Sequence, residues 1–305
     1  MRNLDRKRDA ILITGPTASG KSALAVRLAA EHGGAVVNAD SMQVYDTLDI
    51  LSARPQPAEM GGIEHRLYGH VPAGAAYSTG DWLREATAVV AELRAREKLP
   101  VFVGGTGLYF RALTGGLSDM PVISGDVRER IRARLAEEGA EVLHEELAAR
   151  DAQTAARLKP GDGQRIVRAM EVLEATGKSI SAFQTATGPV VIDPERAEKI
   201  VVLPDRAVLA ARIDRRFGAM LKSGAIDEVK ALLALRLSPA MPVMKAIGVP
   251  QIAAMLAGEM NEAEVIERGA AATRQYAKRQ MTWFRNQLDA SWQRIDPSLN
   301  PAHRI

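Results

Sequence analysis

The chain has 305 residues, of which 47% are hydrophobic and 25% charged, as in a folded globular protein with an ordinary core. It contains no cysteine, which excludes disulfides, thiol catalysis and thiolate zinc sites and predicts a reducing, cytoplasmic compartment. The net charge is only +3 and no apolar run approaches the roughly 18 residues of a membrane helix, so we expect no membrane partner, and any binding of nucleic acid must rest on local basic patches.

Short apolar runs of strand type alternate with helical patterns along the chain. The expected strands are Ile11–Thr14, Ala35–Val37, Leu67–Val71, Val101–Val103 and Ile200–Leu203. Helical spacing is clearest in Ser22–Glu31 and Asp81–Lys98. This alternation predicts an α/β fold, with a parallel sheet of the P-loop NTPase type and helices on both of its faces.

The stretch between the last two expected strands has helical character and no convincing strand. Its amphipathic segments are Asp126–Glu138, Glu141–Ala149 and Asp162–Thr176, the last ending at a C-cap, Gly177. We therefore expect a helical insertion domain at residues 118–196, carried on a core domain formed by residues 1–117 and 197–305. Beyond Arg206 the pattern is helical again, and it is expected to be broken at Pro239, Pro242 and Pro250.

The most specific motif is Gly15–Ser22, which reads G-P-T-A-S-G-K-S and satisfies the phosphate-binding pattern G-x-x-x-x-G-K-[ST]. It follows an expected strand and opens an expected helix, as that loop requires. Successive backbone N–H groups and a helix N-terminus would point at one anion, Lys21 would neutralise the outer phosphate, and the Ser22 hydroxyl would hold Mg²⁺. The alternative is a plain glycine-rich turn. The motif predicts a site for a di- or triphosphate group.

Asp40 follows the second expected strand, in the run N-A-D-S-M-Q that ends at Gln43. Ligands of such sheets lie outside the carboxyl ends of the strands, so Asp40 should share a rim with the phosphate loop. The carboxylate could be a Mg²⁺ ligand, a general base or a helix N-cap, and the residues alone give these readings equal weight.

A glycine cluster, Gly104–Tyr109, follows the fourth expected strand and reads G-G-T-G-L-Y. Its glycines would let a backbone or a ligand come close to the sheet, and Thr106 could donate its hydroxyl to a phosphate or a sugar. Taken alone, the cluster is better explained as a tight strand-to-helix turn.

Two segments that precede the C-terminal region carry clustered cations. Gln164–Arg168 places two arginines on one side of a helix, which suits a phosphate backbone or, more commonly, a solvated face. Arg212, Arg215 and Arg216 follow the fifth expected strand near Asp214, where they could clamp a leaving pyrophosphate or form surface ion pairs.

The C-terminal segment from Arg268 to Arg294 holds six basic residues against one acid, Asp289. Its aromatic residues are Tyr276, Trp283, Phe284 and Trp292. On a helix, one face would carry Arg274, Lys278 and Arg285, and another Tyr276, Arg279 and Trp283. Basic and aromatic side chains together suit RNA loops, whose unstacked bases lie on rings, although a packing helix with a charged outer face explains the pattern equally well.

Taken in order, these stretches resemble the tRNA dimethylallyltransferases of bacterial type, enzymes that prenylate adenosine 37 beside the anticodon. The resemblance rests on Gly15–Ser22, Asp40–Tyr45, Gly104–Tyr109, Gln164–Arg168 and Thr273–Arg285. The phosphate loop alone would fit many enzymes, but its combination with A-D-S-x-Q-V-Y, G-G-T-G-L-Y and T-R-Q-Y-A-K-R-Q-x-T-W is specific. The chain departs from the family pattern at Val249 and Pro250, where an aromatic and a basic residue are usual, and in the run Lys159–Asp162.

The resemblance implies transfer of a dimethylallyl group from dimethylallyl diphosphate to the exocyclic N6 of adenosine 37, with Mg²⁺ as cofactor. Asp40 would then be the general base, and Thr17 would hydrogen-bond near the bridging oxygen of the diphosphate. Ser22 would be the metal ligand. The diphosphate-binding residues would be Gly15, Pro16, Thr17, Ala18, Ser19, Gly20, Lys21, Ser22, Arg212 and Arg216.

The implied macromolecular partner is the anticodon stem-loop of tRNA. The sequence leaves the oligomeric state open, and a monomer is the default expectation. Residues expected to contact it are Asp40, Ser41, Met42, Gln43, Thr106, Arg128, Gln164, Arg165, Ile166, Val167, Arg168, Lys278, Arg279, Trp283 and Arg285. Two competing hypotheses share the phosphate loop: a small-molecule or nucleotide kinase, which would need ATP, and an RNA-binding protein without transferase activity.

Overall fold

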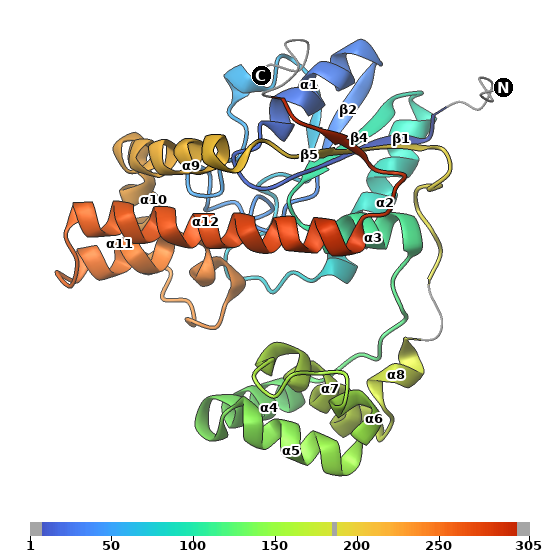
Figure 1. The fold of residues 1–305 in the computed structure, drawn as a ribbon, viewed down its shortest axis with the longest axis vertical. Helices are drawn as coiled ribbons and strands as arrows, with labels where there is room; N and C mark the ends of the chain where they lie inside the picture. Colours follow the sequence, from blue (N-terminus) through green and yellow to red (C-terminus); the bar gives the residue numbers. More distant parts are fainter. Residues whose placement is uncertain (1–7, 185–187, 298–305) are drawn as a thin grey trace. The chain divides into compact units, whose positions relative to one another are not determined.

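The computed structural model describes residues 8–184 and 188–297 (Figure 1). The chain divides into two compact units. The described parts of Met1–Thr114 and Val190–Ile305 form one unit, which contains the sheet, and Gly115–Pro189 forms the other. The assignment of residues 118–196 as an insertion domain stays a prediction.

A six-stranded sheet with the order β3-β2-β4-β1-β5-β6 is the framework of the first unit, and every neighbouring pair of its strands is parallel. The strands are β1 (Ala10–Thr14), β2 (Gly34–Asn38), β3 (His65–Arg66), β4 (Leu99–Gly104), β5 (Ala197–Val202) and β6 (Gln293–Ile295). The predicted α/β fold is therefore confirmed. No helix of the described chain is long and apolar enough to cross a membrane.

Helices cover both faces of the sheet because successive strand residues point to opposite sides. Ile11 and Ile13 of β1 pack with residues of α1 (Lys21–Glu31) on one face. Leu12 of the same strand belongs to the larger cluster on the other face, together with Trp82 of α2 (Thr79–Ala95). Each fully buried large side chain of this kind stabilises the fold by about 1.5–3 kcal/mol before the entropy of ordering it is subtracted.

The other helices of this unit extend the larger cluster and follow the chain from β4 to β6. They are α3 (Gly107–Gly115), α9 (Arg206–Met220), α10 (Ile226–Ala234), α11 (Val249–Leu256) and α12 (Glu262–Gln287). A single π-type turn, Leu221–Ala225, joins α9 to α10. Figure 1 shows α12, in red-orange, running beneath the sheet beside α11, and α9 also packs against it.

Two predictions about these elements are wrong. The expected strand Leu67–Val71 does not form, because Leu67 has a φ of +62° and turns the chain after the short β3, leaving only an isolated bridge at Val71. Pro250 does not break a helix but lies in the first turn of α11, where its missing N–H would have no helical partner anyway. Val249, the other departure from the family pattern, is buried at the start of the same helix.

The second unit is helical, as predicted. It contains α4 (Gly125–Glu138), α5 (Ala140–Arg150), α6 (Ala152–Ala155), α7 (Gly163–Thr176) and α8 (Ile180–Phe183). Its own core includes Ile131, Leu143 and Ile166. Gly177 ends α7 in the left-handed conformation, with a φ of +67°, which confirms the predicted C-cap.

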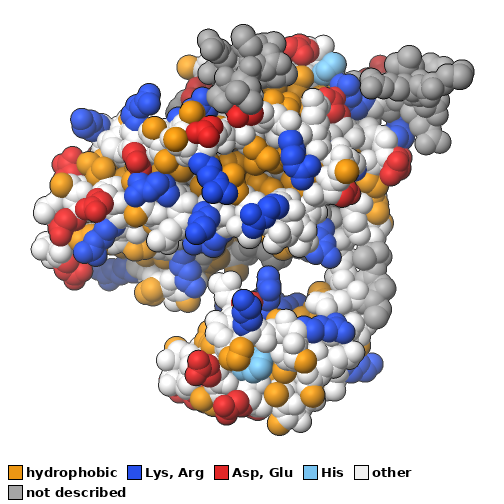
Figure 2. All heavy atoms as spheres, viewed as in Figure 1, with side chains coloured by type: hydrophobic (Ala, Val, Ile, Leu, Met, Phe, Trp, Pro, Cys, Tyr) orange, Lys and Arg blue, Asp and Glu red, His pale blue; other side chains and the backbone are white. Residues whose placement is uncertain are grey.

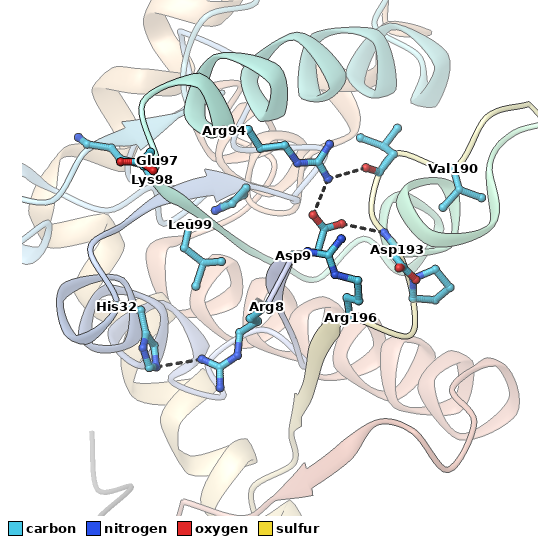
Figure 3. A pocket seen from close by; sticks show the side chains of 13 residues that line it. Arg8, Asp9, His32, Arg94, Glu97, Lys98, Leu99, Val190, Asp193 and Arg196 are labelled. Carbon is cyan, nitrogen blue, oxygen red and sulfur yellow. Dashed lines mark hydrogen bonds and ion pairs between the residues drawn. The ribbon is translucent and has the colours of Figure 1, made fainter. Parts of the chain in front are cut away.

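A cavity of about 850 Å³ lies beside the start of β4, at the amino edge of the sheet (Figure 3). Arg94 of α2 donates to Asp9 Oδ1 (2.7 Å) and to the Val191 carbonyl (3.1 Å), and Asp9 Oδ2 accepts from the Asp193 N–H (2.9 Å). Arg8 donates to His32 at 3.1 Å. These charges are already matched within the protein, so we assign the cavity a structural role: its ion pairs fasten residues 190–196 to α2.

Candidate active site

The phosphate loop Gly15–Ser22 joins β1 to α1 at the carboxyl edge of the sheet. A Cβ at Gly15 would lie 2.6 Å from the Val202 carbonyl oxygen, so only glycine lets the loop pass this close to β5. Gly20, with a φ of +89°, leads into α1 without a side-chain cap. The first N–H groups of α1 therefore have no side-chain acceptor, which is the arrangement that suits an anion.

Three charged side chains from different elements meet at this loop. Lys21 Nζ donates to the Pro16 carbonyl at 3.1 Å, and burial lowers the Lys21 pKa to about 8, while Asp40 raises it and Arg216 lowers it. Burial also lowers the pKa of Arg216, against the opposite influence of Glu59 and Asp40. The structure thus brings two desolvated cations and a carboxylate together.

Arg212 lies one turn before Arg216 on α9, half-buried and with no ion pair among the described residues. Its neighbour Asp214 instead pairs with Arg274 of α12. The sequence could not distinguish surface ion pairs from a phosphate clamp, and the structure divides the cluster. Arg216 is partly buried and interacts electrostatically with Lys21 and Asp40, whereas Asp214 pairs with Arg274 and holds α9 to α12.

Asp40 is held rigidly just after β2. Its own N–H donates to Asn38 Oδ1 (2.9 Å), and its Oδ1 accepts from the Met42 N–H (2.9 Å) in an Asx turn. The fully buried Asn38 amide in turn donates to the carbonyls of Asp40 (3.0 Å) and Leu67 (2.9 Å). Oδ2 is left facing Gly105, whose ideal Cβ would lie 3.4 Å away. One carboxylate oxygen is thereby fixed in place and the other is left for chemistry.

The glycine cluster after β4 allows a close backbone approach. A Cβ at Gly104 would lie 2.0 Å from the Ala39 carbonyl oxygen, and one at Gly107 would lie 2.3 Å from the Trp283 ring. Thr106 Oγ1 accepts from the Ser41 N–H (3.0 Å) and donates to Ser41 Oγ (3.3 Å). The cluster is the tight strand-to-helix turn that we favoured, since α3 begins at Gly107, and it also orders the residues after Asp40.

The charge of Asp40 influences three tyrosine side chains. Burial raises the pKa values of Tyr68, Tyr109 and Tyr276, and the charge of Asp40 raises each of them further. The hydroxyl groups of all three tyrosines are therefore within the electrostatic range of the carboxylate. A charge among buried groups interacts more strongly with its partners than it would in water.

The residues after Asp40 hold this loop in shape. Ser41 and Met42 use their N–H groups in the bonds above, and Gln43 Nε2 donates to the carbonyls of Ser52 (3.0 Å) and Ala53 (2.9 Å). The side-chain nitrogen of Gln43 therefore already has two partners within the protein. The predicted contact of Gln43 with RNA stays a prediction, and it would have to use the other polar groups of this residue.

Gln280 of α12 joins the phosphate loop to the glycine cluster, and the sequence alone did not single it out. Its Oε1 accepts from the Thr17 N–H and its Nε2 donates to the Gly105 carbonyl, both at 3.0 Å, and it is only 6% exposed. The available signal was periodicity: Gln280 stands between the buried Ala277 and Phe284 on the inner face of α12. A polar residue at a core position of an amphipathic helix requires hydrogen-bond partners.

Cations line the outer side of α12, as predicted, and Figure 2 shows Lys and Arg side chains gathered over this helix around a hydrophobic surface. Lys278, Arg279 and Arg285 are exposed. Lys278 and Arg285 share with Arg274 one groove of about 590 Å³ between α9 and α12, with Arg206 and Arg294 at its rim, and its floor is apolar. The sequence did not place Arg206 at this surface.

The aromatic residues of the C-terminal segment have different positions. Trp283 lies against Gly107, and Tyr276 lies under Arg279, whose guanidinium is 5.7 Å from the ring centre. Phe284 is buried, and Trp292 lies beyond α12 and packs edge-on against Phe110 at 5.8 Å. The pattern therefore combines an exposed cationic face with a packing face.

In the second unit, α7 carries the predicted run Gln164–Arg168. Gln164 and Arg165 are exposed, and Arg165 pairs with Asp162 at 3.3 Å. Arg168 pairs with the buried Glu171 at 3.4 Å. The expected side-chain contacts of Ile166 and Val167 with RNA are corrected, because both are buried in the core of this unit.

Arg128 of α4 has a different environment from the other predicted RNA contacts. Its Nε is buried with no hydrogen-bond partner among the described residues. Its neighbours Ser124 and Val127 use their groups in capping α4, where the Val127 N–H donates to Ser124 Oγ at 3.4 Å. The contact of Arg128 with RNA stays a prediction.

Comparison with known families identifies relatives over nearly the whole chain. The family model described as IPP transferase matches residues 43–287, and the one described as isopentenyl transferase matches residues 8–70. The tRNA dimethylallyltransferase of Rhizobium meliloti (strain 1021) is 72% identical over 97% of this chain and 98% of its own length. That of Agrobacterium fabrum is 68% identical over 97% of this chain and the whole of its own.

Solved structures give the same result. The tRNA isopentenylpyrophosphate transferase of Bacillus halodurans is similar with a TM-score of 0.67 and 34% identity, over 95% of this chain and 90% of that one. A eukaryotic dimethylallyltransferase acting on tRNA is similar with a TM-score of 0.78 and 27% identity, over 95% and 74% of the two chains.

Proposed function

The chain belongs to the IPP transferase family, and from that premise we propose that it transfers the dimethylallyl group of dimethylallyl diphosphate to the exocyclic N6 of adenosine 37 in tRNA. It is a tRNA-modifying prenyltransferase. The relatives give no support to a kinase or to an RNA-binding protein without transferase activity. The proposed residue roles rest on one observation: Lys21, Arg216 and Asp40 lie close enough at the phosphate loop to influence one another electrostatically.

The diphosphate would lie in the loop Gly15–Ser22, against the uncapped N-terminus of α1. Lys21 and Arg216 are partly buried cations, and burial lowers the pKa of each. A bound diphosphate would supply a counter-charge, with Arg212 reaching it from the preceding turn of α9. Leaving-group stabilisation is therefore built from groups that need no rearrangement as charge develops.

The donor groups also fit Mg²⁺. Ser22 stands in the first turn of α1, and Ser19 Oγ is buried in the loop without a hydrogen-bond partner in the described chain. The described residues contain no cluster of three or more His, Cys, Asp or Glu groups, so the remaining ligands would be diphosphate oxygens and waters, as Mg²⁺ tolerates. When bound on the Ser22 hydroxyl, Mg²⁺ would offset the negative charge of the diphosphate.

In the reaction, N6 of the adenosine forms a bond to the allylic carbon while that carbon's bond to the diphosphate oxygen breaks. An exocyclic amine is a poor nucleophile, and its proton becomes acidic only as the new bond forms. Asp40 would accept that proton on Oδ2, since Oδ1 is held by the Met42 N–H. An ordinary carboxylate within reach is sufficient for this step. Thr17 would hydrogen-bond near the bridging oxygen, and its backbone is fixed by Gln280.

The RNA would bind the cationic side of α12 through Lys278, Arg279 and Arg285, with Trp283 offering a ring for an unstacked base. The target adenosine has to leave the stack of its loop to reach Asp40. Additional contacts would come from Ser41, Thr106 and the backbone around Met42. In the second unit they would come from Arg128, Gln164, Arg165 and Arg168.

The test of these roles is the variant Asp40→Asn, which keeps size and hydrogen bonds but removes the proton acceptor. Single-turnover transfer should fall by about 100-fold or more, while the Kd for an anticodon stem-loop changes by less than about threefold. Asp46→Asn is the matched control, because Asp46 lies exposed in the same loop and its carboxylate accepts a hydrogen bond from the neighbouring Thr47 hydroxyl. Unchanged chemistry in Asp40→Asn would contradict the assignment. The monomeric state and cytoplasmic location stay predictions.

A further inference from the structure

We propose that Gln280 is a positioning residue that couples the RNA-binding helix α12 to the two loops around the reacting groups, so that RNA and diphosphate bind cooperatively. This inference rests on the proposed function. It concerns how the two substrate sites communicate, which the family assignment does not address.

The coupling depends on one side chain that bridges two loops distant in sequence. Thr17 in the phosphate loop donates its N–H to Gln280 Oε1, and Gln280 Nε2 donates to the Gly105 carbonyl, each bond being 3.0 Å long. With Gln280 only 6% exposed, solvent cannot readily replace either bond. Thr17 and Gly105 therefore share one rigid partner.

The amide also lies close to the proposed base. The ideal Cβ of Gly105 would lie 2.2 Å from Gln280 Nε2 and 3.4 Å from Asp40 Oδ2, so both groups border the same glycine. A neutral amide offers one acceptor and one donor at the same reach, whereas an ionised Glu can only accept. Glutamine satisfies both loops without adding a second negative charge beside Asp40.

On α12 itself, Gln280 lies next to the groups proposed to bind RNA. Lys278 and Arg279 precede it and are exposed, and Trp283, one turn later, lies against Gly107. A helix transmits a small shift along its length as a rigid body. RNA that fixes α12 would thus fix Thr17 and the Gly104–Gly107 turn through Gln280. Because binding free energies are reciprocal, diphosphate in the loop must tighten RNA by the same factor.

The experiment measures the Kd of inorganic pyrophosphate, with Mg²⁺ present, in the absence and presence of a saturating anticodon stem-loop RNA that carries adenosine 37. In the unaltered protein the RNA should tighten pyrophosphate by about tenfold or more, within the usual range of coupling between sites. In Gln280→Met, which keeps the volume but loses both bonds, this factor should fall below about two. The control is Gln275→Met, an exposed glutamine on the same helix, which should keep the full factor.

The kinetic readout separates positioning from stability. At saturating RNA and dimethylallyl diphosphate, Gln280→Met should lower the single-turnover rate by about 100-fold, the cost of a misplacement near 1 Å. Its Kd for RNA alone should change by less than about threefold. A merely structural role would lower the melting temperature and the fraction of active protein, but not the rate per titrated site or the coupling factor.

A second variant keeps the proposal testable if Gln280→Met does not fold. Gln280→Glu keeps the acceptor for Thr17 but not the donor to Gly105, and it should lose most of the coupling while staying folded. An unchanged coupling factor in either folded variant would overturn the proposal, as would independent binding of the two ligands to the unaltered protein. If the unaltered protein bound neither ligand, the proposed function itself would fail, so the two failures are distinguishable.

Discussion

The crossing of α9 and α12 can be tested with two glycines that should respond in opposite ways to the same substitution. Gly269 of α12 is buried against Phe217 of α9, and a Cβ there would lie 1.9 Å from the Phe217 ring. Gly218 of α9, the residue after Phe217, has nothing within 4 Å of its ideal Cβ. Both glycines lie inside helices, so replacing either one by alanine should improve the intrinsic helix propensity by the same amount.

The expected magnitudes follow from this geometry. Alanine improves helix propensity by about 0.5–1 kcal/mol at either position. At Gly269 the Phe217 ring must move by about 1.5 Å to reach an ordinary contact of 3.4 Å, and this ring is only 4% exposed within the main core. Overpacking of that kind costs about 1–3 kcal/mol or more. We therefore expect Gly269→Ala to lose about 2 kcal/mol net and Gly218→Ala to gain up to about 1 kcal/mol.

The assay is urea unfolding followed by tryptophan fluorescence. The chain has three tryptophans, Trp82, Trp283 and Trp292, all in the unit that contains the sheet, so the signal reports that unit. The difference between the two variants is the informative quantity, since errors in the linear extrapolation largely cancel. A Gly269→Ala protein as stable as the unaltered one would refute the close packing of α9 on α12.

Three further predictions concern charge. Lys278→Ala and Arg285→Ala should each weaken stem-loop binding and lower the slope of log K against log salt concentration by about one. The control Lys230→Ala on α10 should change neither quantity. A change in melting temperature alone would support the packing-helix interpretation. Lys21→Met should leave the free energy of unfolding unchanged or raised, because it removes a charge that is partly shielded from water, yet weaken pyrophosphate binding by about 100-fold. Tight pyrophosphate binding in that variant would exclude Lys21 from the site. Hydrogen bonds from Arg96 and Lys98 lower the pKa of Glu64 to about 2, so its stabilisation is present above its ordinary value of 4.5 and is lost as the pH falls toward 2. Urea unfolding of Glu64→Gln across that range should therefore show a flatter loss of stability than the unaltered protein, and identical slopes would contradict the ion pairs.

The sequence predicted what local patterns determine. The phosphate loop, the strands β1, β2, β4 and β5, and the amphipathic α4 and α7 all follow from residue spacing, and the structure contains them. The expected strand at Leu67–Val71 did not form because a positive φ at Leu67, which composition does not reveal, ends the pairing. β6 was missed because a three-residue edge strand has too few positions to show a period.

The site was less predictable because its parts come from distant segments. Asp40 could be a ligand, a base or a cap on sequence grounds. The structure adds that Oδ1 accepts from the Met42 N–H in an Asx turn, whereas Oδ2 faces Gly105, and the role of general base stays a proposal. Periodicity could have placed Gln280 on the inner face of α12, but not its two partners, because Thr17 and Gly105 are more than 170 residues away along the chain. Burial likewise removed Ile166 from the predicted RNA contacts, since a motif does not show which way a side chain points.

The most direct test of the account combines the purified protein, Mg²⁺, dimethylallyl diphosphate and an unmodified anticodon stem-loop, with the RNA product analysed by mass spectrometry. The account predicts the gain of one dimethylallyl unit on adenosine 37, no gain when that adenosine is replaced, and none with the Asp40→Asn variant. Hydrolysis of ATP, or transfer of a phosphoryl group to a small acceptor without any change in the RNA, would contradict it.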